Sequence, residues 1–212
     1  MYLPAHFRED RPDVQHALLR AHPLGTLVTA GPAGLLANHV PFLLYADEGP
    51  HGILRAHLAR ANAQLEELRQ ITECLVVFQG AEDYITPSWY ATKQETGKVV
   101  PTWNFVTVHV WGAPQVIDDP QWLRRQLDDV TASQEHARPR PWQVDDAPAD
   151  FIRAQMTAIV GLELPIARIE GKWKISQNRS VADRQGVAAG LHAQGQSSAA
   201  MTALVAATLP KA

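Results

Sequence analysis

The chain has 212 residues, of which 46% are hydrophobic and 19% are charged, as is typical of a soluble globular protein. Its net charge of -3 gives no overall attraction to nucleic acid, so DNA contact would need a local basic patch. The single cysteine, Cys74, excludes an internal disulfide and a cysteine-based zinc site. No apolar run approaches the roughly 20 residues that cross a bilayer. The first residues also lack the apolar centre of a signal peptide, so we expect a cytoplasmic protein without membrane contact.

The first half of the chain is predicted to form short strands joined by turns. Asp10 as a cap and Pro12 in the first turn predict a helix over 12–21. Strands are expected at 24–29, 35–45, 52–58, 75–79 and 83–86, with a hairpin turn at 30–34 and a short helix from Asn62 to about Gln70. Both alternating faces of the strand at 35–45 are mostly apolar, so both are expected to be covered.

The second half contains one long strand and most of the helices. Alternating valines predict a strand over 102–111. Further along we expect a helix capped near Asp118 or Asp119, a loop over 135–148, a helix over 149–160, strands at 163–169 and 172–176 joined by a tight turn at Glu170–Gly171, and two alanine-rich helices. Strands early and helices late indicate an α+β fold with a barrel-like antiparallel sheet. The glycine-rich turn of a dinucleotide-binding fold and the P-loop are absent from the sequence.

Aromatic residues gather between residues 86 and 111, although they make up only 7% of the chain. Trp89, Tyr90, Trp103 and Trp111 alternate there with hydroxyl, amide and ammonium groups. Flat side chains among fixed polar groups suit a planar, hydrogen-bonding ligand. The alternative is that the tryptophans fill the core of a barrel.

Six blocks of sequence stand out in a fixed order: MYLPAHF at 1–7, LANHVPF at 36–42, HLARAN at 57–62, SWYATK at 88–93, VPTWNFV at 100–106 and KISQN at 174–178. Together these blocks resemble the PaiB family of FMN-binding negative transcriptional regulators. The resemblance covers residues 1 to about 192. It implies an antiparallel split β-barrel of the FMN-binding type, with peripheral and C-terminal helices, and a homodimer that holds FMN at the subunit interface. It also implies a split-barrel domain over 1–180 and a C-terminal helical extension over 181–212, packed on the barrel or on the partner.

The residues predicted to bind the cofactor come from these blocks. They are Asn38, His39, Val40, His57, Ala59, Arg60, Asn62, Trp89, Tyr90, Lys93, Thr102, Trp103 and Asn104. The segment 57–62 ends a strand and opens a helix, where unpaired N–H groups attract anions. Arg60 adds a bidentate partner for phosphate oxygens and His57 a further hydrogen bond. The alternative is a surface arginine beside an ordinary strand histidine.

The other candidates suit the remaining parts of a flavin. An amide such as Asn38 can pair with the polar edge of the ring, or simply with backbone at a sheet edge. A tryptophan such as Trp103 could stack on the ring, and Lys93 could reach phosphate or ribityl oxygens. Lys174, Gln177 and Asn178 could complete the pocket from the other subunit, or cap the helix that follows them.

A flavin-dependent transcriptional regulator is therefore the first functional hypothesis. A flavin-dependent oxidoreductase, or a flavin- or haem-binding protein on the same barrel, is the alternative, with His39 or His57 as the axial ligand of a haem. The sequence contains no metal-binding motif and no activated nucleophile, so catalytic residues are not assigned. Direct DNA contact has weak support, because aspartates neighbour the basic clusters at 124–125 and 138–140.

Overall fold

The computed structural model describes residues 1–32 and 34–210, which form two compact units. Unit 1 comprises Met1–Leu18, Gln79–Val108 and Glu170–Ala212, and unit 2 comprises Leu19–Phe78 and His109–Ile169. Four elements belong in part to each unit because the chain passes through them: α1 (Pro12–Ala21), β6 (Cys74–Ile85), β7 (Thr102–Gly112) and β10 (Arg168–Lys174). No helix among the described residues is long and apolar enough to span a bilayer.

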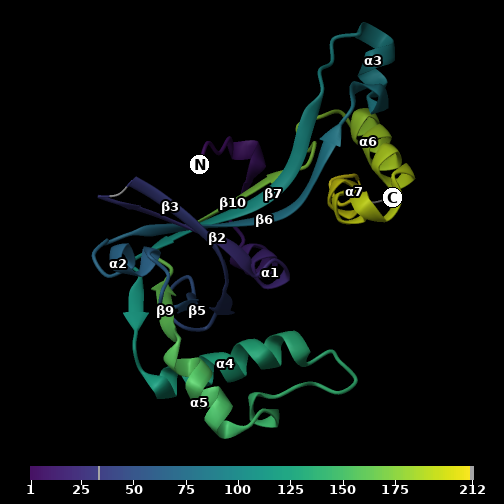
Figure 1. Cartoon of the computed structure of the whole chain (residues 1–212). Coiled ribbons are helices and arrows are strands. Elements are labelled where there is room, and N and C mark those ends of the chain that lie inside the picture. Colours follow the sequence, from purple (N-terminus) through teal and green to yellow (C-terminus); the bar gives the residue numbers. More distant parts are fainter. Residues whose placement is uncertain (33, 211–212) are drawn as a thin grey trace. The chain divides into compact units, whose positions relative to one another are not determined.

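Unit 2 is built from two antiparallel sheets and three α-helices. In one sheet, β2 (Leu24–Gly31) lies between β3 (Gly34–Pro41) and the first part of β6. The other sheet has the order β4 (Leu43–Tyr45), β5 (Ile53–Ala59), β9 (Ile159–Pro165) and β8 (Gln115–Ile117). The helices are α2 (Gln64–Leu68), α4 (Pro120–Glu135) and α5 (Ala149–Thr157), and η3 (Val144–Asp146) is a short 3-10 turn. Figure 1 shows α4 and α5 as neighbours in this unit.

The core of unit 2 follows from the alternation of side chains along its strands. Leu54, Ala56 and Leu58 of β5 lie opposite Leu164, Leu162 and Val160 of β9, and all six are buried. The intervening residues of β5 point to the opposite face of the sheet. This face carries Arg55 and His57, which contact polar groups on other elements of the unit.

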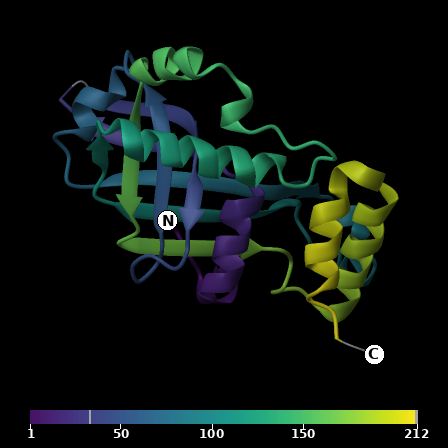
Figure 2. The same ribbon diagram turned by 90° about the horizontal axis from the view of Figure 1, so that it is seen from below.

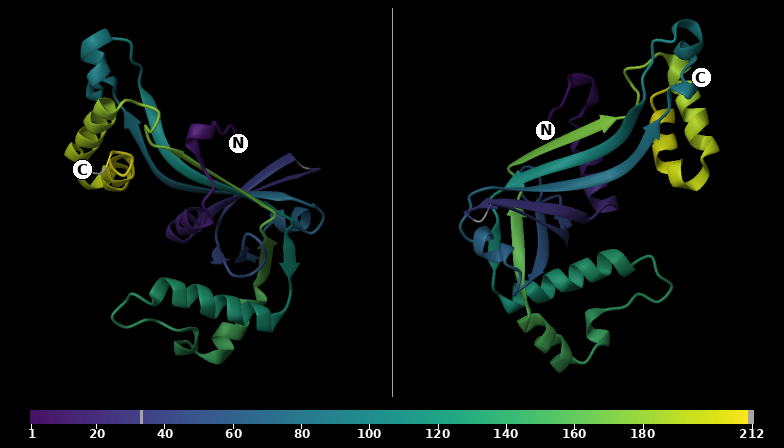
Figure 3. Two further views of the ribbon diagram at one scale, coloured as in Figure 1. Left: turned by 180° about the vertical axis from the view of Figure 1, so that it is seen from behind. Right: turned by 45° about the horizontal axis from the view of Figure 1, so that its top comes forward.

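Unit 1 combines a sheet with the C-terminal helices. Its strand order is β1 (Arg8–Glu9), β10, β7 and β6. Its helical segments are η1 (Ala5–Phe7), η2 (Pro87–Trp89), α3 (Ala91–Thr96), α6 (Val181–Ala193), η4 (Gly195–Ser198) and α7 (Ala199–Ala206). α6 and α7 pack against each other, as Figure 2 shows in yellow. α6 also contacts η2 and α3, and Figure 3 shows this group of helices from two sides.

Asp183 joins α6 to α3. Its carboxylate accepts hydrogen bonds from the backbone N–H and the hydroxyl of Thr92, each at 2.9 Å. Burial by itself would raise the pKa of Asp183, but the hydrogen bonds from Thr92 and Ser180 outweigh it and the pKa is lowered. The carboxylate is therefore charged at neutral pH and holds the start of α3 against α6.

Several sequence predictions are confirmed. α1 covers the predicted residues, and Asp119 caps α4 by accepting a hydrogen bond from the Gln121 N–H at 2.8 Å. The loop over 135–148 and the two C-terminal helices are also present, although η3 interrupts the loop. The strands predicted at 75–79 and 83–86 form one continuous strand, β6. Ala33 of the predicted turn at 30–34, and residues 211–212 of the predicted C-terminal extension, lie outside the described residues.

The tight turn predicted at Glu170–Gly171 is wrong. Both residues lie inside β10, and the chain turns at Ile166 and Ala167 instead. Gly171 pairs with Glu9 of β1, and a Cβ atom built on it would lie 2.7 Å from the Glu9 carbonyl oxygen. The glycine therefore marks a close approach of two strands, which is a common role of glycine within a sheet.

Three other element predictions need correction. The helix predicted over 149–160 ends at Thr157, because the following residues pair in β9. The strand predicted over 35–45 is divided between β3 and β4. The face of β3 that carries Leu35 and His39 is exposed rather than covered, and Leu35 keeps 77% of its surface accessible. α3 lies in a segment where no helix was predicted.

Candidate functional site

A cluster of exposed aromatic and half-buried cationic side chains lies on β6, β7 and β10 of unit 1. We call it the Trp103 cluster and define it as Tyr84, Thr102, Trp103, Lys172 and Lys174. Trp103 is 54% exposed, and its ring meets the ring of Tyr84 edge to face, with centroids 6.0 Å apart. The Lys174 ammonium donates to the Thr102 hydroxyl and to the Trp103 carbonyl. The cluster thus combines an open indole with an ammonium that is held by the backbone of the same residue.

Lys174 has the charge environment of an anion-binding residue. Burial lowers its pKa, and the positive charges of Lys172 and Arg179 lower it further. The acceptors that it contacts are neutral oxygens, so no carboxylate offsets the cost of holding the ammonium there. A bound anion would supply the missing negative charge. The Lys172 ammonium lies 5.3 Å from the centre of the Phe105 ring, which keeps a second cation nearby.

Other predicted residues of unit 1 have partners within the fold. The Trp89 indole lies against Gly190 of α6. Tyr90 is buried beneath the Arg179 guanidinium, which lies 4.7 Å from the ring centre. Asn104 is also buried, and its amide donates to the Ser176 hydroxyl at 2.9 Å. These three side chains pack the unit, so a ligand would have to displace internal contacts to reach them. Lys93 is exposed and donates to the Ser88 hydroxyl at 3.2 Å.

In unit 2, Arg60 clamps the end of α5. Its backbone N–H donates to the Ala158 carbonyl at 2.8 Å, and its guanidinium donates to the carbonyls of Thr157 and Ile159 at 3.1 and 3.0 Å. The same guanidinium forms a bidentate pair with Asp118, with both distances 2.8 Å. Phosphate would therefore have to compete with Asp118. Both side chains are exposed, and exposed ion pairs are weak. A phosphate dianion could therefore replace Asp118 as the partner of the guanidinium.

The remaining predicted residues on the strands and turns of unit 2 differ in accessibility. Ala59 and His39 are exposed, whereas Val40 is buried in the core. Asn62 accepts a hydrogen bond from the Gln64 N–H at 2.9 Å and so turns the chain into α2. Because this helix has only five residues, few peptide dipoles are aligned and their attraction for an anion is weak.

Asn38 belongs to a buried polar chain beneath α2. Its amide donates to Gln64 at 2.9 Å, the Gln64 amide donates to the Thr29 hydroxyl at 3.1 Å, and this hydroxyl donates to Glu67 at 2.6 Å. Gln64, Thr29 and Glu67 are all buried. The second carboxylate oxygen of Glu67, Oε1, has no hydrogen-bond partner among the described residues. Buried hydrogen-bonded networks of this kind fix the relative position of the elements they join. The orientation of Asn38 on β3 is therefore set by α2.

His57 is hydrogen bonded to α4. Its Nδ1 lies 2.8 Å from Oε1 of the buried Gln126. On the same face of β5, Arg55 contacts Glu163 and Glu48, and its guanidinium lies 4.2 Å from the centre of the Tyr45 ring. The common face of Arg55 and His57 is evident from their spacing in the sequence. Their partners are not, because Gln126 and Glu163 lie more than sixty residues away along the chain.

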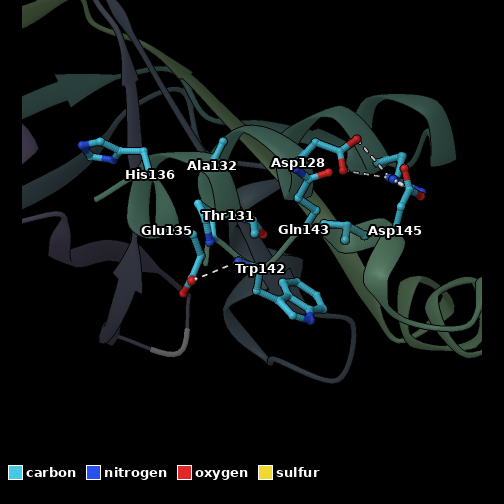
Figure 4. A pocket seen from close by; sticks show the side chains of 11 residues that line it. Asp128, Thr131, Ala132, Glu135, His136, Trp142, Gln143 and Asp145 are labelled. Carbon is cyan, nitrogen blue, oxygen red and sulfur yellow. Dashed lines mark hydrogen bonds and ion pairs between the residues drawn. The ribbon is translucent and has the colours of Figure 1, made fainter. Parts of the chain in front are cut away.

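Several cavities of unit 2 border α4, and two of them differ in their relation to the predicted site. One, of about 350 Å³, lies between α4 and the segment 141–145, and Figure 4 shows Trp142, Glu135 and Asp128 on its wall. It contains none of the predicted cofactor-binding residues. The other, of about 460 Å³, lies between α4 and α5 and has Arg60 at its edge. Over residues 1–32 and 34–210, no three His, Cys, Asp or Glu residues are grouped so that they could hold a metal ion.

Comparison with protein families gives a match over residues 1–168 to a family described as "Putative FMN-binding domain". The chain belongs to this family. A similar protein, Protease synthase and sporulation protein PAI 2 of Bacillus subtilis, is 28% identical over 187 residues, which cover 88% of this chain and 87% of that protein. Uncharacterized protein AN0679 of Emericella nidulans is 33% identical over 230 residues, covering 92% of each chain.

Solved structures confirm the fold class. The FAD and haem binding protein from Mycobacterium smegmatis superposes with a TM-score of 0.59 at 16% identity, over 79% of this chain and 73% of that one. The conserved hypothetical protein Rv2991 from Mycobacterium tuberculosis gives a TM-score of 0.56 at 13% identity, over 82% and 91%. At these identities the likeness concerns the fold alone. The predicted α+β split β-barrel is confirmed.

Proposed function

We propose that this protein binds FMN as a cytoplasmic homodimer and regulates transcription in response to the flavin. The observation that carries the flavin proposal is the exposed Trp103 indole on the strand whose Thr102 hydroxyl and Trp103 carbonyl hold the Lys174 ammonium, in a chain of the family described as "Putative FMN-binding domain". An indole face binds a planar ring, and a cation with neutral partners binds an anion. The regulatory part is supported by the similarity to PAI 2, whose name refers to protease synthesis and sporulation.

The homodimer is supported by the exposed apolar residues of unit 1. Val100, Trp103 and Tyr84 keep 65%, 54% and 47% of their surfaces accessible. Aromatic residues are enriched in the centres of protein interfaces, where they lose contact with water. A second copy of the chain would cover these residues and shield a flavin that lies on Trp103.

Replacing Trp103 by alanine is expected to weaken FMN binding. Stacking of a heteroaromatic base on an aromatic side chain contributes about 1–3 kcal/mol, which corresponds to roughly a 5- to 150-fold change in Kd. The measurement is a titration of the protein with FMN, followed by quenching of flavin fluorescence. Trp142→Ala is the matched control, because Trp142 is also exposed but belongs to unit 2. Equal affinities of the two variants would exclude Trp103 from the flavin site.

The same titration tests the phosphate site predicted at Arg60. Asp118→Asn removes the carboxylate that pairs with the guanidinium. If the phosphate binds there, the variant should bind FMN more tightly and riboflavin unchanged. Unchanged FMN affinity would place the phosphate elsewhere.

The absorption spectrum of the purified protein also distinguishes flavin from haem, and a gel shift at low salt distinguishes direct from indirect regulation.

If the phosphate binds at Lys174 instead of Arg60, FMN affinity should fall as the pH rises through the lowered pKa of Lys174. An anion binds better to the protonated amine, so the affinity is fully present below this pKa and is lost above it. The measurement is the Kd for FMN between about pH 7 and pH 10, compared with that of Lys174→Gln, whose curve should be flatter and weaker. Parallel curves for the two proteins would mean that Lys174 does not contact the phosphate.

A further inference from the structure

An apolar groove runs between α4 and α5 in unit 2. Two adjoining cavities, of about 460 and 480 Å³, share Pro120, Arg153 and Met156. Leu123 of α4 and Ile152 of α5 add to the apolar lining. Cavities of several hundred cubic ångströms with mostly apolar walls are the usual size and character of small-molecule sites. The groove is therefore large enough for an organic ligand.

Contacts at both ends hold the groove open. At one end, Arg60 bonds the carbonyl of Thr157 in α5 and the carboxylate of Asp118, which precedes α4. Toward the other end, Arg124 of α4 pairs with Asp145, which precedes α5, at 2.7 Å. These bonds fix the spacing of the two helices. The apolar side chains between them cannot be covered by a simple collapse of α5 onto α4.

α5 is amphipathic but incompletely covered. None of its residues is buried, although Ile152 and Met156 face the groove and are partly accessible. A helix whose apolar stripe stays open to a preformed groove has apolar surface available for a ligand.

The charges at the rim select the kind of ligand. Arg125 and Arg153 line the groove and are exposed, and neither takes part in an ion pair within the described part of the chain. The other rim arginines, Arg60 and Arg124, are already paired with carboxylates. The groove thus carries two arginines without a carboxylate partner, next to an apolar floor. Guanidinium groups bind carboxylates through paired hydrogen bonds.

We propose that the α4–α5 groove binds an anionic amphiphile: a small molecule with an apolar chain and a terminal carboxylate. The chain lies along Leu123, Ile152 and Met156, and the carboxylate pairs with Arg153 or Arg125. The Trp103 cluster belongs to the other unit and is not part of this site. The carboxylate site uses Arg153 and Arg125 rather than Arg60, so a ligand here is an effector in addition to the flavin.

The test uses dodecanoate as the probe, below its micelle-forming concentration, in calorimetric titrations of the FMN-saturated protein. We expect saturable binding of one dodecanoate per chain, and at least tenfold weaker binding of dodecylammonium. Arg153→Gln should weaken dodecanoate binding about tenfold, as expected for the loss of about 1.4 kcal/mol of charge-assisted hydrogen bonding. Met156→Glu, which places a negative charge in the apolar floor, should weaken it further. Arg140→Gln is the control, because Arg140 is exposed but does not line the groove.

Several results would overturn the proposal. They are no saturable binding, equal binding of dodecylammonium, or unchanged dodecanoate binding by both groove variants. Competition between FMN and dodecanoate would assign the groove to the flavin itself and would also contradict a separate site. Thermal unfolding of each variant shows whether it is folded. The exposed Arg153 keeps the test valid if Met156→Glu does not fold.

Discussion

Replacing Arg55 by methionine is expected to lower the free energy of unfolding by about 2–3 kcal/mol. The Arg55 guanidinium donates to Glu163 at 2.6 Å and to both carboxylate oxygens of Glu48 at 3.0 and 2.7 Å. The side chains of Arg55 and Glu163 are less than one-fifth exposed. Removing the cation leaves the Glu163 carboxylate partly buried without its partner, and this desolvated charge is the main source of the loss.

The reference for this prediction is the double variant Arg55→Met, Glu163→Met. It removes both charges, so it should be more stable than Arg55→Met alone. Arg55→Lys should fall between the wild type and Arg55→Met, because an ammonium keeps the charge but cannot pair with two carboxylates through a planar fork. Urea unfolding of the four proteins is the measurement. A loss below about 0.5 kcal/mol in Arg55→Met would show that the contacts are worth no more than an ordinary exposed pair.

Replacing Gly186 by alanine is expected to destabilise unit 1 by about 3 kcal/mol, although the same change usually stabilises a helix by about 1 kcal/mol. Gly186 lies in α6 against the backbone of Trp89, and an added methyl group would overlap the Trp89 carbonyl oxygen. A backbone atom of a packed segment cannot rotate away. The helix would have to move from η2, and the bonds between Asp183 and Thr92 would be strained as well.

Gly190→Ala provides a comparison one turn further along α6. Its methyl group would overlap the Trp89 indole rather than the backbone. Shortening the side chain in Trp89→Leu should therefore relieve the defect of Gly190→Ala but not that of Gly186→Ala. Ala189→Gly, at an exposed position of the same helix, should cost about 1 kcal/mol by propensity alone. Thermal unfolding of the single and double variants is the measurement, and equal relief of both glycine variants by Trp89→Leu would contradict this packing.

Local sequence patterns predicted an element correctly where the contact that determines it lies within a few residues along the chain. Asp119 and Pro120 predict the start of α4 because a cap and a missing N–H act within one helical turn. The alternation of Val106, Val108 and Val110 with other residues predicts β7, and all three valines are buried. The family and its fold were predictable for a different reason, since six motifs in a fixed order identify a known architecture.

Sequence alone determined the α+β class, most of the elements and the membership of the family described as "Putative FMN-binding domain". Only the tertiary structure decided which tryptophan is accessible to solvent: Trp89 is packed on Gly190, whereas Trp103 is exposed. It also decided that Arg60 clamps α5, whose end lies 97 residues further along the chain. The physical reason is that burial and hydrogen-bond partners depend on which distant segments meet, and local propensity carries no information about such meetings.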